Sequence, residues 1–545
     1  MLCLLHGYQL EGSGSNLWTR SILEVLCRKG KEVHLVCQEN KPEKYDFISD
    51  ALVYLEDGSR KQLFSRKVSF PGKVIFHRPY IGKLIPVYLG KSYPGFERAI
   101  PMSDLTDDEI ANYINKNVFV VENIIKEFGI TFLHANHAVL MSVVALRTSQ
   151  SLRIPYGIMP HGSAIEYVVK KDVRFKELAS EAFAGAKVIF ISNEEIQERL
   201  RNVFPNVPNL NEKMVKLGIG VDTSHFKPLS QIKPLSQKQR MDALERLKKY
   251  INELPEGKNT ILKKKLFENL TPSLSKESYY KLLEQCSTYR KKTPDSTFTQ
   301  ELSEVAWDRE RIALFVGRLI SEKGIQSILA ALPFVLEKDP ELRLIVVGHG
   351  PLREFLEAFL IALEKGDGTL VNNIAQWDTQ QKEQPDPYLQ GLREFIQEQI
   401  DKDFFSQYIK RAVKYLKSNR VIFSGYLSHR ELMLLFPLCH VVIIPSIVVE
   451  AGPMVLLEAL SCGCFPLGTN QGGMAVNIRL ASQKLSPEHA DLMKLNPDGK
   501  QMIFDIIDKL PKAFSLGSRY SETFRDLALT HFDWNCVAKP LLDRS

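Results

Sequence analysis

The sequence has no cysteine pattern that would build a metal site or a disulfide framework. Its eight cysteines are scattered along 545 residues, and only Cys462 and Cys464 lie close together. No pair of Cys-x-x-Cys motifs occurs, which argues against the common structural zinc sites. A chain of this length does not need disulfides to stabilise its core, so we expect reduced thiols and a cytoplasmic protein.

Long hydrophobic runs are also missing. The most apolar stretch, residues 441–449, is interrupted by Pro445 and Ser446. A membrane-spanning helix needs about 18 or more apolar residues in a row, so the sequence predicts no transmembrane segment. The apolar residues at the N-terminus are too few for a signal peptide and are typical of a first strand. Peripheral contact with the inner face of a membrane stays open.

Charge of one sign is not concentrated in the chain. The sequence has 71 Lys and Arg against 64 Asp and Glu, a formal net charge of +7. This mild excess favours anionic ligands, and the basic residues are interleaved with acidic ones. No motif of a nucleic-acid-binding module occurs, so we expect no nucleic-acid partner.

Short apolar segments alternate with helical patterns in two successive sets. The first set starts at residues 2–5 and 33–37, and the second restarts at residues 312–316 and 343–347. Strands that alternate with helices form crossover units around a parallel sheet. The sequence therefore predicts an α/β fold of two Rossmann-like domains facing across a cleft, with ligands at the carboxyl ends of the strands.

Two segments do not follow this alternation. We expect an N-terminal domain over 1–226, a helical insertion or linker over 227–311 and a C-terminal domain over 312–520. A second helical insertion covers about 359–417, and a C-terminal helix over 521–545 is expected to cross back to the first domain. Both insertions are interpreted as solvated helical additions, with an oligomer contact or partner surface as alternatives.

Two polar constellations belong to the first domain. The glycine turn at Gly12 and Gly14 precedes a helical pattern and would let a phosphate approach the backbone, although a simple tight turn explains it equally well. His161 follows the strand pattern of residues 156–159, where an imidazole can bind a sugar hydroxyl. His134 and His137 are weaker candidates after the preceding strand.

The second domain begins with a glycine turn that carries two cations. Gly317 follows an apolar strand, and Arg318 and Lys323 lie five residues apart before a helix. Arginine forms forked hydrogen bonds to phosphate oxygens, and lysine adds a point charge. The pattern indicates a diphosphate site that neutralises a leaving group without a metal ion.

Two glutamates follow another apolar strand of the second domain. Glu450 and Glu458 are eight positions apart, which on a helix is two turns and about 80 degrees, so they would share one broad side. Glu450 is expected just before a helix that Gly452 and Pro453 open. A carboxylate accepts hydrogen bonds from both hydroxyls of a diol, so this pair suits a sugar and a ribose.

Together these motifs resemble the retaining glycosyltransferases of the two-Rossmann-domain type, glycosyltransferase family 4, also called glycosyl transferases group 1. The resemblance is carried by Phe-Val-Gly-Arg-Leu with Glu-Lys-Gly (315–324), by Glu-x7-Glu (450–458), by Gly472-Gly473 and by the stretch 218–228. In one position the chain departs from the family, because Val476 stands where a glutamate is common.

The resemblance implies a role for each matching residue. Arg318 and Lys323 would hold the donor diphosphate, Gly14 and Gly317 would approach it, and His161 would contact the donor sugar. Glu458 would bind the ribose. The donor sugar would be held by Glu450 and by the loop residues Ala451, Gly452, Pro453 and Met454.

The implied activity is a metal-independent transfer of a hexosyl group with retention, from a nucleotide-diphosphate sugar to a hydroxyl acceptor. The acceptor would be a sugar, glycan, sugar phosphate or glycolipid, with residues 77–103 as part of its surface. UDP is the favoured nucleotide, with GDP or ADP as alternatives, and no cofactor is expected. The only Asp-x-Asp, at Asp401 and Asp403, lies in a charged helical segment rather than after a strand, so no metal site is expected.

Two other functions stay open at this stage. A sugar-nucleotide epimerase or hydrolase would use the same fold but needs further acid and base residues. A non-catalytic nucleotide-sugar-binding protein would keep the site without turnover. The sequence does not fix the oligomeric state.

Overall fold

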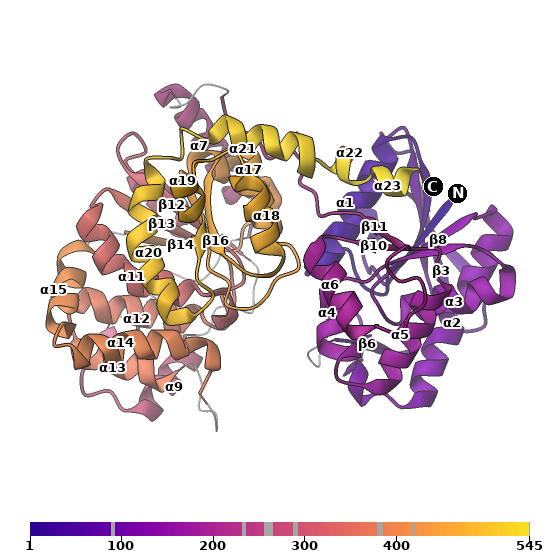
Figure 1. The fold of residues 1–545 in the computed structure, drawn as a ribbon, viewed down its shortest axis with the longest axis horizontal. Coiled ribbons are helices and arrows are strands. Elements are labelled where there is room, and N and C mark those ends of the chain that lie inside the picture. The colour runs from indigo at the N-terminus through magenta and orange to yellow at the C-terminus, as the bar shows by residue number, and fades with distance from the viewer. Residues whose placement is uncertain are drawn as a thin grey trace. The chain divides into compact units, whose positions relative to one another are not determined.

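The computed structural model of this protein describes residues 1–88, 93–230, 236–255, 265–266, 268–286, 293–378, 385–416 and 420–543. The chain divides into two compact units, each with its own large sheet (Figure 1). Unit 1 contains residues 1–220 and 531–545, and unit 2 contains residues 221–530.

Unit 1 is built on a sheet with the strand order β11-β10-β9-β8-β1-β2-β5-β3-β4. Neighbouring strands are parallel except for β3 and β4. The chain continues from β1 to β2 on one side and later adds β8 on the other, so the loops after β1 and β8 meet at a switch point. The strands are β1 (Leu2–Leu5), β2 (Glu32–Val36), β3 (Ile48–Tyr54), β4 (Arg60–Ser65), β5 (Lys73–Arg78), β8 (Phe132–Asn136), β9 (Tyr156–Met159), β10 (Val188–Ile191) and β11 (Met214–Lys216), with β6 (Leu84–Val87) and β7 (Arg98–Pro101) as a separate parallel pair.

Helix α3 of unit 1 packs on α2 and on α5, whereas α1 packs on α22. The yellow C-terminal helices α22 and α23 lie beside the indigo α1 in Figure 1. Trp534, Val537 and Leu541 of this segment join the core that contains Trp18 of α1. The last residues of the chain are thereby part of unit 1. The helices of unit 1 are α1 (Gly14–Arg28), α2 (Asp107–Phe128), α3 (Met141–Leu152), α4 (Gly162–Ala164), α5 (Val173–Gly185), α6 (Glu194–Val203), α22 (Trp534–Val537) and α23 (Lys539–Leu542).

Unit 2 is built on a fully parallel sheet with the order β14-β13-β12-β15-β16-β17. The order reverses between β12 and β15, so the loops after these two strands meet at the switch point of this sheet. The strands are β12 (Arg311–Val316), β13 (Leu342–Val347), β14 (Val421–Gly425), β15 (Val441–Ile444), β16 (Phe465–Thr469) and β17 (Lys494–Leu495). Two sheets of this kind confirm the predicted α/β fold of two Rossmann-like domains.

The described helices of unit 2 surround this sheet and extend well beyond the repeating crossover pattern (Figure 1). They are α7 (Gln237–Asn252), α9 (Lys276–Gln285), α10 (Phe298–Glu304), α11 (Ile325–Lys338), α12 (Arg353–Lys365), α13 (Gly368–Trp377), α14 (Gln390–Asp401), α15 (Phe405–Tyr415), α16 (His429–Leu435), α17 (Met454–Ser461), α18 (Gly472–Ser482), α19 (Pro487–Leu492), α20 (Gly499–Phe514) and α21 (Ser521–Leu527).

Helices α12 to α15 are not the solvated addition that the sequence suggested. Their apolar side chains are buried, with Phe359, Leu370 and Phe395 fully enclosed. Tyr408 of α15 is also buried and donates a hydrogen bond to the carbonyl of Ala330 on α11, at 3.0 Å. The charge-rich sequence hid an amphipathic pattern, and these helices belong to the hydrophobic core of unit 2.

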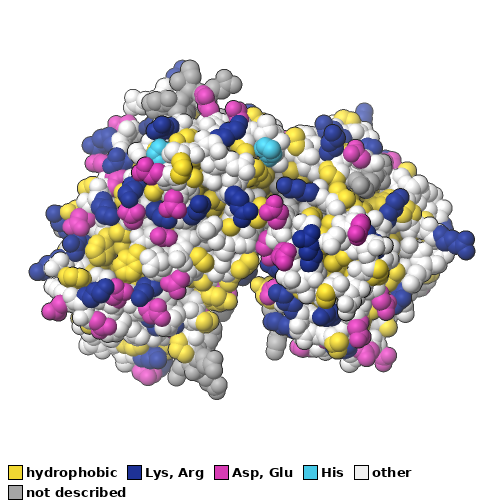
Figure 2. All heavy atoms as spheres, in the orientation of Figure 1, with side chains coloured by type: hydrophobic (Ala, Val, Ile, Leu, Met, Phe, Trp, Pro, Cys, Tyr) yellow, Lys and Arg dark blue, Asp and Glu magenta, His cyan; other side chains and the backbone are white. Residues whose placement is uncertain are grey.

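A search of the described residues finds no helix with the length and apolarity required to cross a lipid bilayer. On the face drawn in Figure 2, lysine and arginine side chains alternate with aspartate and glutamate.

Unit 1 buries a histidine pair between neighbouring strands. His34 on β2 and His77 on β5 are both fully buried, and Nδ1 of His34 lies 2.9 Å from Nε2 of His77. The hydroxyl of Tyr54 lies 3.1 Å from Nδ1 of His77. The pair is consistent with neutral rings in which Tyr54 donates to His77 and His77 donates to His34. Burial lowers the pKa of His34 to about 4 and that of His77 well below its ordinary value.

We predict that acid destabilises unit 1 through this pair. In the unfolded chain a histidine takes up a proton below about pH 6.5, but the folded His34 resists protonation down to about pH 4. The contribution of His34 to the free energy of unfolding is therefore complete above pH 6.5. It falls as the pH drops toward 4, by roughly 3 kcal/mol for a pKa difference of this size. Urea unfolding between pH 4 and 8 measures the loss, and the H34Q/H77Q variant should show a flatter profile. Equal pH profiles of the two proteins would contradict the assignment.

Candidate active site

The loop after β12 carries the two predicted cations. It leaves the strand at Gly317, whose N–H donates to the carbonyl of Val347 at 3.0 Å, and forms the 3-10 turn η4 (Ser321–Lys323). Gly324 then ends the turn with a φ of +70°. Arg318 is exposed, and among the described residues it has no ion-pair partner. Its guanidinium is therefore available to a ligand.

The loop after β15 lies directly against this turn. The N–H of Ile447 donates to the carbonyl of Glu322 at 2.8 Å. A Cβ on Gly324 would come within 1.9 Å of the carbonyl oxygen of Pro445, so the two backbones touch where only glycine fits. The switch point of unit 2 thus brings together two loops that are more than 120 residues apart in the sequence.

The contact aligns a cation and a carboxylate. Nζ of Lys323 lies 2.8 Å from Oε1 of Glu450, and both side chains keep part of their surface exposed. Two residues that the sequence motifs placed in one site are therefore neighbours in the structure. Each side chain can leave the other to bind a ligand, because neither is fully enclosed.

The glycine pair after β16 holds the backbone of Glu450. The N–H of Gly473 donates to the carbonyl of Glu450 at 2.8 Å. Gly472 has a φ of +53°, and a Cβ there would come within 2.8 Å of the same carbonyl oxygen. The side chain of Gln471 donates to the carbonyls of Ser446 and Ile447, at 3.1 and 2.9 Å. Val476 follows on α18 and is half-buried.

Glu450 and Glu458 do not share one helix side. Helix α17 begins at Met454 with Pro453 as its N-cap, so Glu450, Ala451 and Gly452 precede it. Glu458 lies within the helix, is almost fully buried, and its Oε1 is 3.1 Å from Nε2 of His429. The two carboxylates therefore have separate partners. The expected position of Glu450 just before the helix is confirmed, so the helical-wheel angle between the two glutamates does not apply.

Gly14 and His161 lie in unit 1, at the carboxyl ends of its strands. Gly14 opens helix α1, which Ser13 caps by accepting a hydrogen bond from the N–H of Asn16 at 3.3 Å. A Cβ on Gly14 would meet no atom within 4 Å, so its backbone faces open space. His161 follows β9, and its Nε2 lies 3.2 Å from Oδ1 of Asn136.

A cluster of aromatic rings surrounds His161. Its ring is 4.8 Å from that of His137 and 5.4 Å from that of Trp18, and the ring of His6 lies 5.7 Å from that of His137. Desolvation in this cluster lowers the pKa of His161 to about 3 and that of His6 to about 4. His161 is therefore neutral at physiological pH and acts as a hydrogen-bonding group rather than as a cation.

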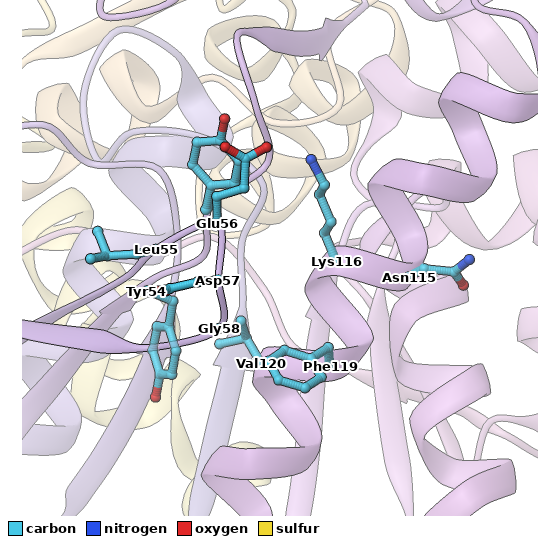
Figure 3. A pocket seen from close by; sticks show the side chains of 10 residues that line it. Tyr54, Leu55, Glu56, Asp57, Gly58, Asn115, Lys116, Phe119 and Val120 are labelled. Carbon is cyan, nitrogen blue, oxygen red and sulfur yellow. The ribbon is translucent and has the colours of Figure 1, made fainter.

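Unit 1 also has a hollow of about 350 Å³ between the turn after β3 and helix α2 (Figure 3). Glu56 of the turn and Lys116 of the helix lie on either side of it, and Phe119 contributes a half-exposed ring. Nζ of Lys116 lies 4.9 Å from the ring centre of Tyr80. Tyr80 belongs to the segment predicted for the acceptor, whereas Tyr93 of that segment packs against Tyr8. Residues 89–92 of the segment lie outside the described residues.

In the part of the chain that the structure describes, no three His, Cys, Asp or Glu side chains are grouped to hold a metal ion. At the switch point of unit 2, the loop after β12 carries Arg318 and Lys323, which can bind an anion.

The family of the second unit follows from a comparison with known proteins. Residues 299–378 and 390–490 match the family model described as glycosyl transferases group 1. Unit 2 carries a glycosyltransferase group 1 domain. Its match includes the loop of Arg318 and Lys323, Glu450, Glu458 and the glycine pair, so the resemblance to glycosyl transferases group 1 is confirmed for these motifs, as is the glycosyltransferase class for this domain.

Solved structures share the fold of the whole chain. They include sucrose-phosphate synthase from Thermosynechococcus elongatus (TM-score 0.54, 16% identity, 100% of this chain and 97% of that one). The catalytic domain of starch synthase IV from Arabidopsis thaliana, bound to ADP and acarbose, gives a TM-score of 0.54 at 12% identity over 99% and 98% of the chains. Anabaena HepE in complex with UDP gives 0.52 at 14% identity over 100% and 98%.

A curated relative is similar over a shorter stretch. An uncharacterized glycosyltransferase of Methanocaldococcus jannaschii is 25% identical over 167 residues. The match spans 31% of this chain and 29% of that relative.

Sequence reasoning missed several residues that shape this glycosyltransferase domain. His429 follows β14 and contacts Glu458, and Gln471 follows β16 and holds the loop of Glu450. Both are polar residues shortly after a strand, which is the signal that had identified Arg318. In unit 1 the same signal would have found His6 directly after β1.

We predict that Gly324 cannot accept a side chain. Alanine at Gly324 would press on the backbone carbonyl of Pro445, whereas at Gly366, with a similar φ of +73°, its close contact would be with a side-chain methyl of Val413, which can move aside. Both variants share the cost of the left-handed backbone, so G324A should lower the stability of unit 2 by about 2–3 kcal/mol more than G366A. Urea unfolding of both variants measures the difference, and equal losses would contradict the proposed backbone contact.

Proposed function

We propose that the protein is a retaining, metal-independent glycosyltransferase that moves a hexosyl group from a nucleotide-diphosphate sugar to a hydroxyl acceptor. The observation that carries the proposal is the pairing of Lys323 with Glu450 at 2.8 Å beside the exposed Arg318, at the switch point of a glycosyltransferase domain. Ligands of such sheets bind at this point.

The two cations would act on the diphosphate. Negative charge grows on the leaving group as the glycosidic bond breaks, and Arg318 offers two donors to its oxygens while Lys323 adds a nearby charge. Because the loop is held by its backbone contacts and Lys323 is already paired with Glu450, this lysine needs little reorganisation during the reaction. The two cations would stabilise the negative charge of the diphosphate, which a metal ion does in other sugar-nucleotide enzymes.

The sugar would be held by the loop of Glu450. When the diphosphate takes the lysine, the Glu450 carboxylate becomes free to accept hydrogen bonds from sugar hydroxyls. The backbone from Ala451 to Met454 borders the start of α17 and would complete this contact. Glu458 would bind the ribose together with His429, because that histidine is partly exposed and shares its carboxylate.

Retention would follow from a front-face reaction. In it a donor phosphate oxygen takes the proton of the acceptor hydroxyl, and the new bond forms on the face from which the diphosphate leaves. This route needs no protein base, which agrees with the neutral His161 as a hydrogen-bond partner of the donor sugar. Gly14 would let the diphosphate approach the start of α1.

The choice of nucleotide is proposed from what the fold relatives bind, and the class of acceptor from the side chains of unit 1. UDP is the favoured nucleotide because the fold relative HepE is in complex with UDP, while ADP in starch synthase IV keeps adenosine as an alternative and GDP remains to be tested. A carbohydrate or glycolipid acceptor would suit the hollow of unit 1, where Phe119 offers a ring and Glu56 and Lys116 offer polar groups. A cytoplasmic location is proposed from the scattered cysteines.

We predict that Arg318 is required for turnover. Removing a group that stabilises charge in the transition state costs about 2.7–4 kcal/mol in comparable sites, so R318A should lower turnover about 10²–10³-fold. Nucleotide release from UDP-glucose, GDP-mannose and ADP-glucose, with a panel of sugar and sugar-phosphate acceptors, measures it. R309A is the matched control, since Arg309 is exposed just before the opposite end of β12. Unchanged turnover in R318A would refute the role, and the absence of turnover with every donor would refute the function.

A further inference from the structure

The turn that carries Lys323 touches a segment outside the matched family domain. The family match stops at residue 378 and resumes at residue 390. The described residues 385–389 lie in this gap, and their 3-10 turn η5 (Pro387–Leu389) packs against η4. A segment outside the family match therefore borders the cation loop.

The contact is made by a buried hydroxyl. Oγ of Ser321, the first residue of η4, donates a hydrogen bond to Oδ2 of Asp386 at 2.6 Å. The same Oγ lies 3.3 Å from Oε2 of Glu322, so the shorter contact to Asp386 takes its proton. Ser321 is only 5% exposed, and water is therefore a poor substitute for the carboxylate.

A second side chain reinforces the contact between the turns. Nε2 of Gln326, on helix α11, donates to the carbonyl of Ser321 at 2.9 Å and to the carbonyl of Tyr388 at 3.0 Å. Gln326 is itself almost fully buried. The two turns are thus joined both by their side chains and through a shared donor.

Asp386 is fixed from its own side of the contact. Its Oδ1 accepts from the N–H of Tyr388 at 2.9 Å, and its carbonyl accepts from Nη2 of Arg393 at 2.6 Å. Its N–H donates to Oδ2 of Asp378. Arg393 and Asp378 are both largely buried, so the carboxylate that receives the serine hydroxyl is itself held in place.

We propose that Asp386 is a positioning residue for the donor diphosphate. It holds Ser321 at one end of the single turn whose other end is Lys323. The contact of Ile447 with Glu322 holds the middle of this turn, so the two contacts together set Nζ of Lys323 against Glu450. This inference rests on the proposed function, because it assigns the positioned cation to a diphosphate.

The test compares two ligands that differ only in the diphosphate. The probes are whichever of UDP, GDP and ADP the wild-type protein binds most tightly, and the corresponding nucleoside, measured by calorimetry and by competition. D386A should bind the diphosphate about tenfold more weakly and the nucleoside as tightly as wild type, because a hydrogen bond to a charged group is lost at the cation loop only. Thermal unfolding without ligand reports whether each variant is folded.

Three further variants separate positioning from a general structural effect. S321A and the double variant S321A/D386A should match D386A, because the two side chains act through one contact. D386N should bind almost as wild type does, since its amide can donate to the serine hydroxyl while its oxygen still accepts from Tyr388. D401A, at an exposed carboxylate at the end of α14, is the matched control and should behave as wild type.

The outcomes are distinct. Wild-type affinity of D386A for the diphosphate would overturn the inference, and so would an equal loss of diphosphate and nucleoside by a folded D386A. If D386A does not fold, the comparison is made with S321A under the same two criteria. Wild-type protein that binds none of the three diphosphates would refute the proposed function, and the inference with it.

Discussion

The backbone contact between the loops after β12 and β15 is the constraint on which the rest of the site depends. The carbonyl of Glu322 accepts from the N–H of Ile447 at 2.8 Å, and Gly324 lies against the carbonyl of Pro445. This approach is required because the two strands are neighbours in the sheet where its order reverses. With the backbones in contact, Lys323 of one loop reaches Glu450 of the other.

The same contact explains how a site can be charged and yet ordered before a ligand binds. Lys323 has Glu450 as its partner, and the glycine pair and Gln471 fix the backbone beneath Glu450. Arg318 stays exposed. A diphosphate would therefore find Lys323 already in position, whereas the exposed side chain of Arg318 could move to contact it. Because the fold already orders Lys323, binding requires less reorganisation of the site.

Features that depend on neighbouring residues could be predicted from the sequence, whereas contacts between residues far apart in the chain could not. Arg318 and Lys323 were found because they follow an apolar strand in a family motif, and the two sheets because strand and helix patterns alternate. Asp386 was missed because its partner Ser321 lies 65 positions away, and no local pattern reports such a contact. His429 follows a strand as Arg318 does, but its contact with Glu458, 29 positions away, is known only from the fold. The buried faces of α14 and α15 were hidden by charged residues on their exposed faces, and α12 buries charged side chains such as Arg353 and Glu357 together with its apolar ones. Composition alone cannot distinguish such helices from solvated ones.

The most direct measurement of the central claim is a titration of the full-length protein with UDP-, GDP- and ADP-sugars, with and without EDTA. The account predicts that one nucleotide stabilises the protein, by about 2.7 kcal/mol at a hundred times its dissociation constant, and that EDTA leaves this unchanged. It further predicts that K323A weakens the binding. A protein that no nucleotide sugar stabilises at millimolar concentration, or whose binding EDTA abolishes, would contradict it.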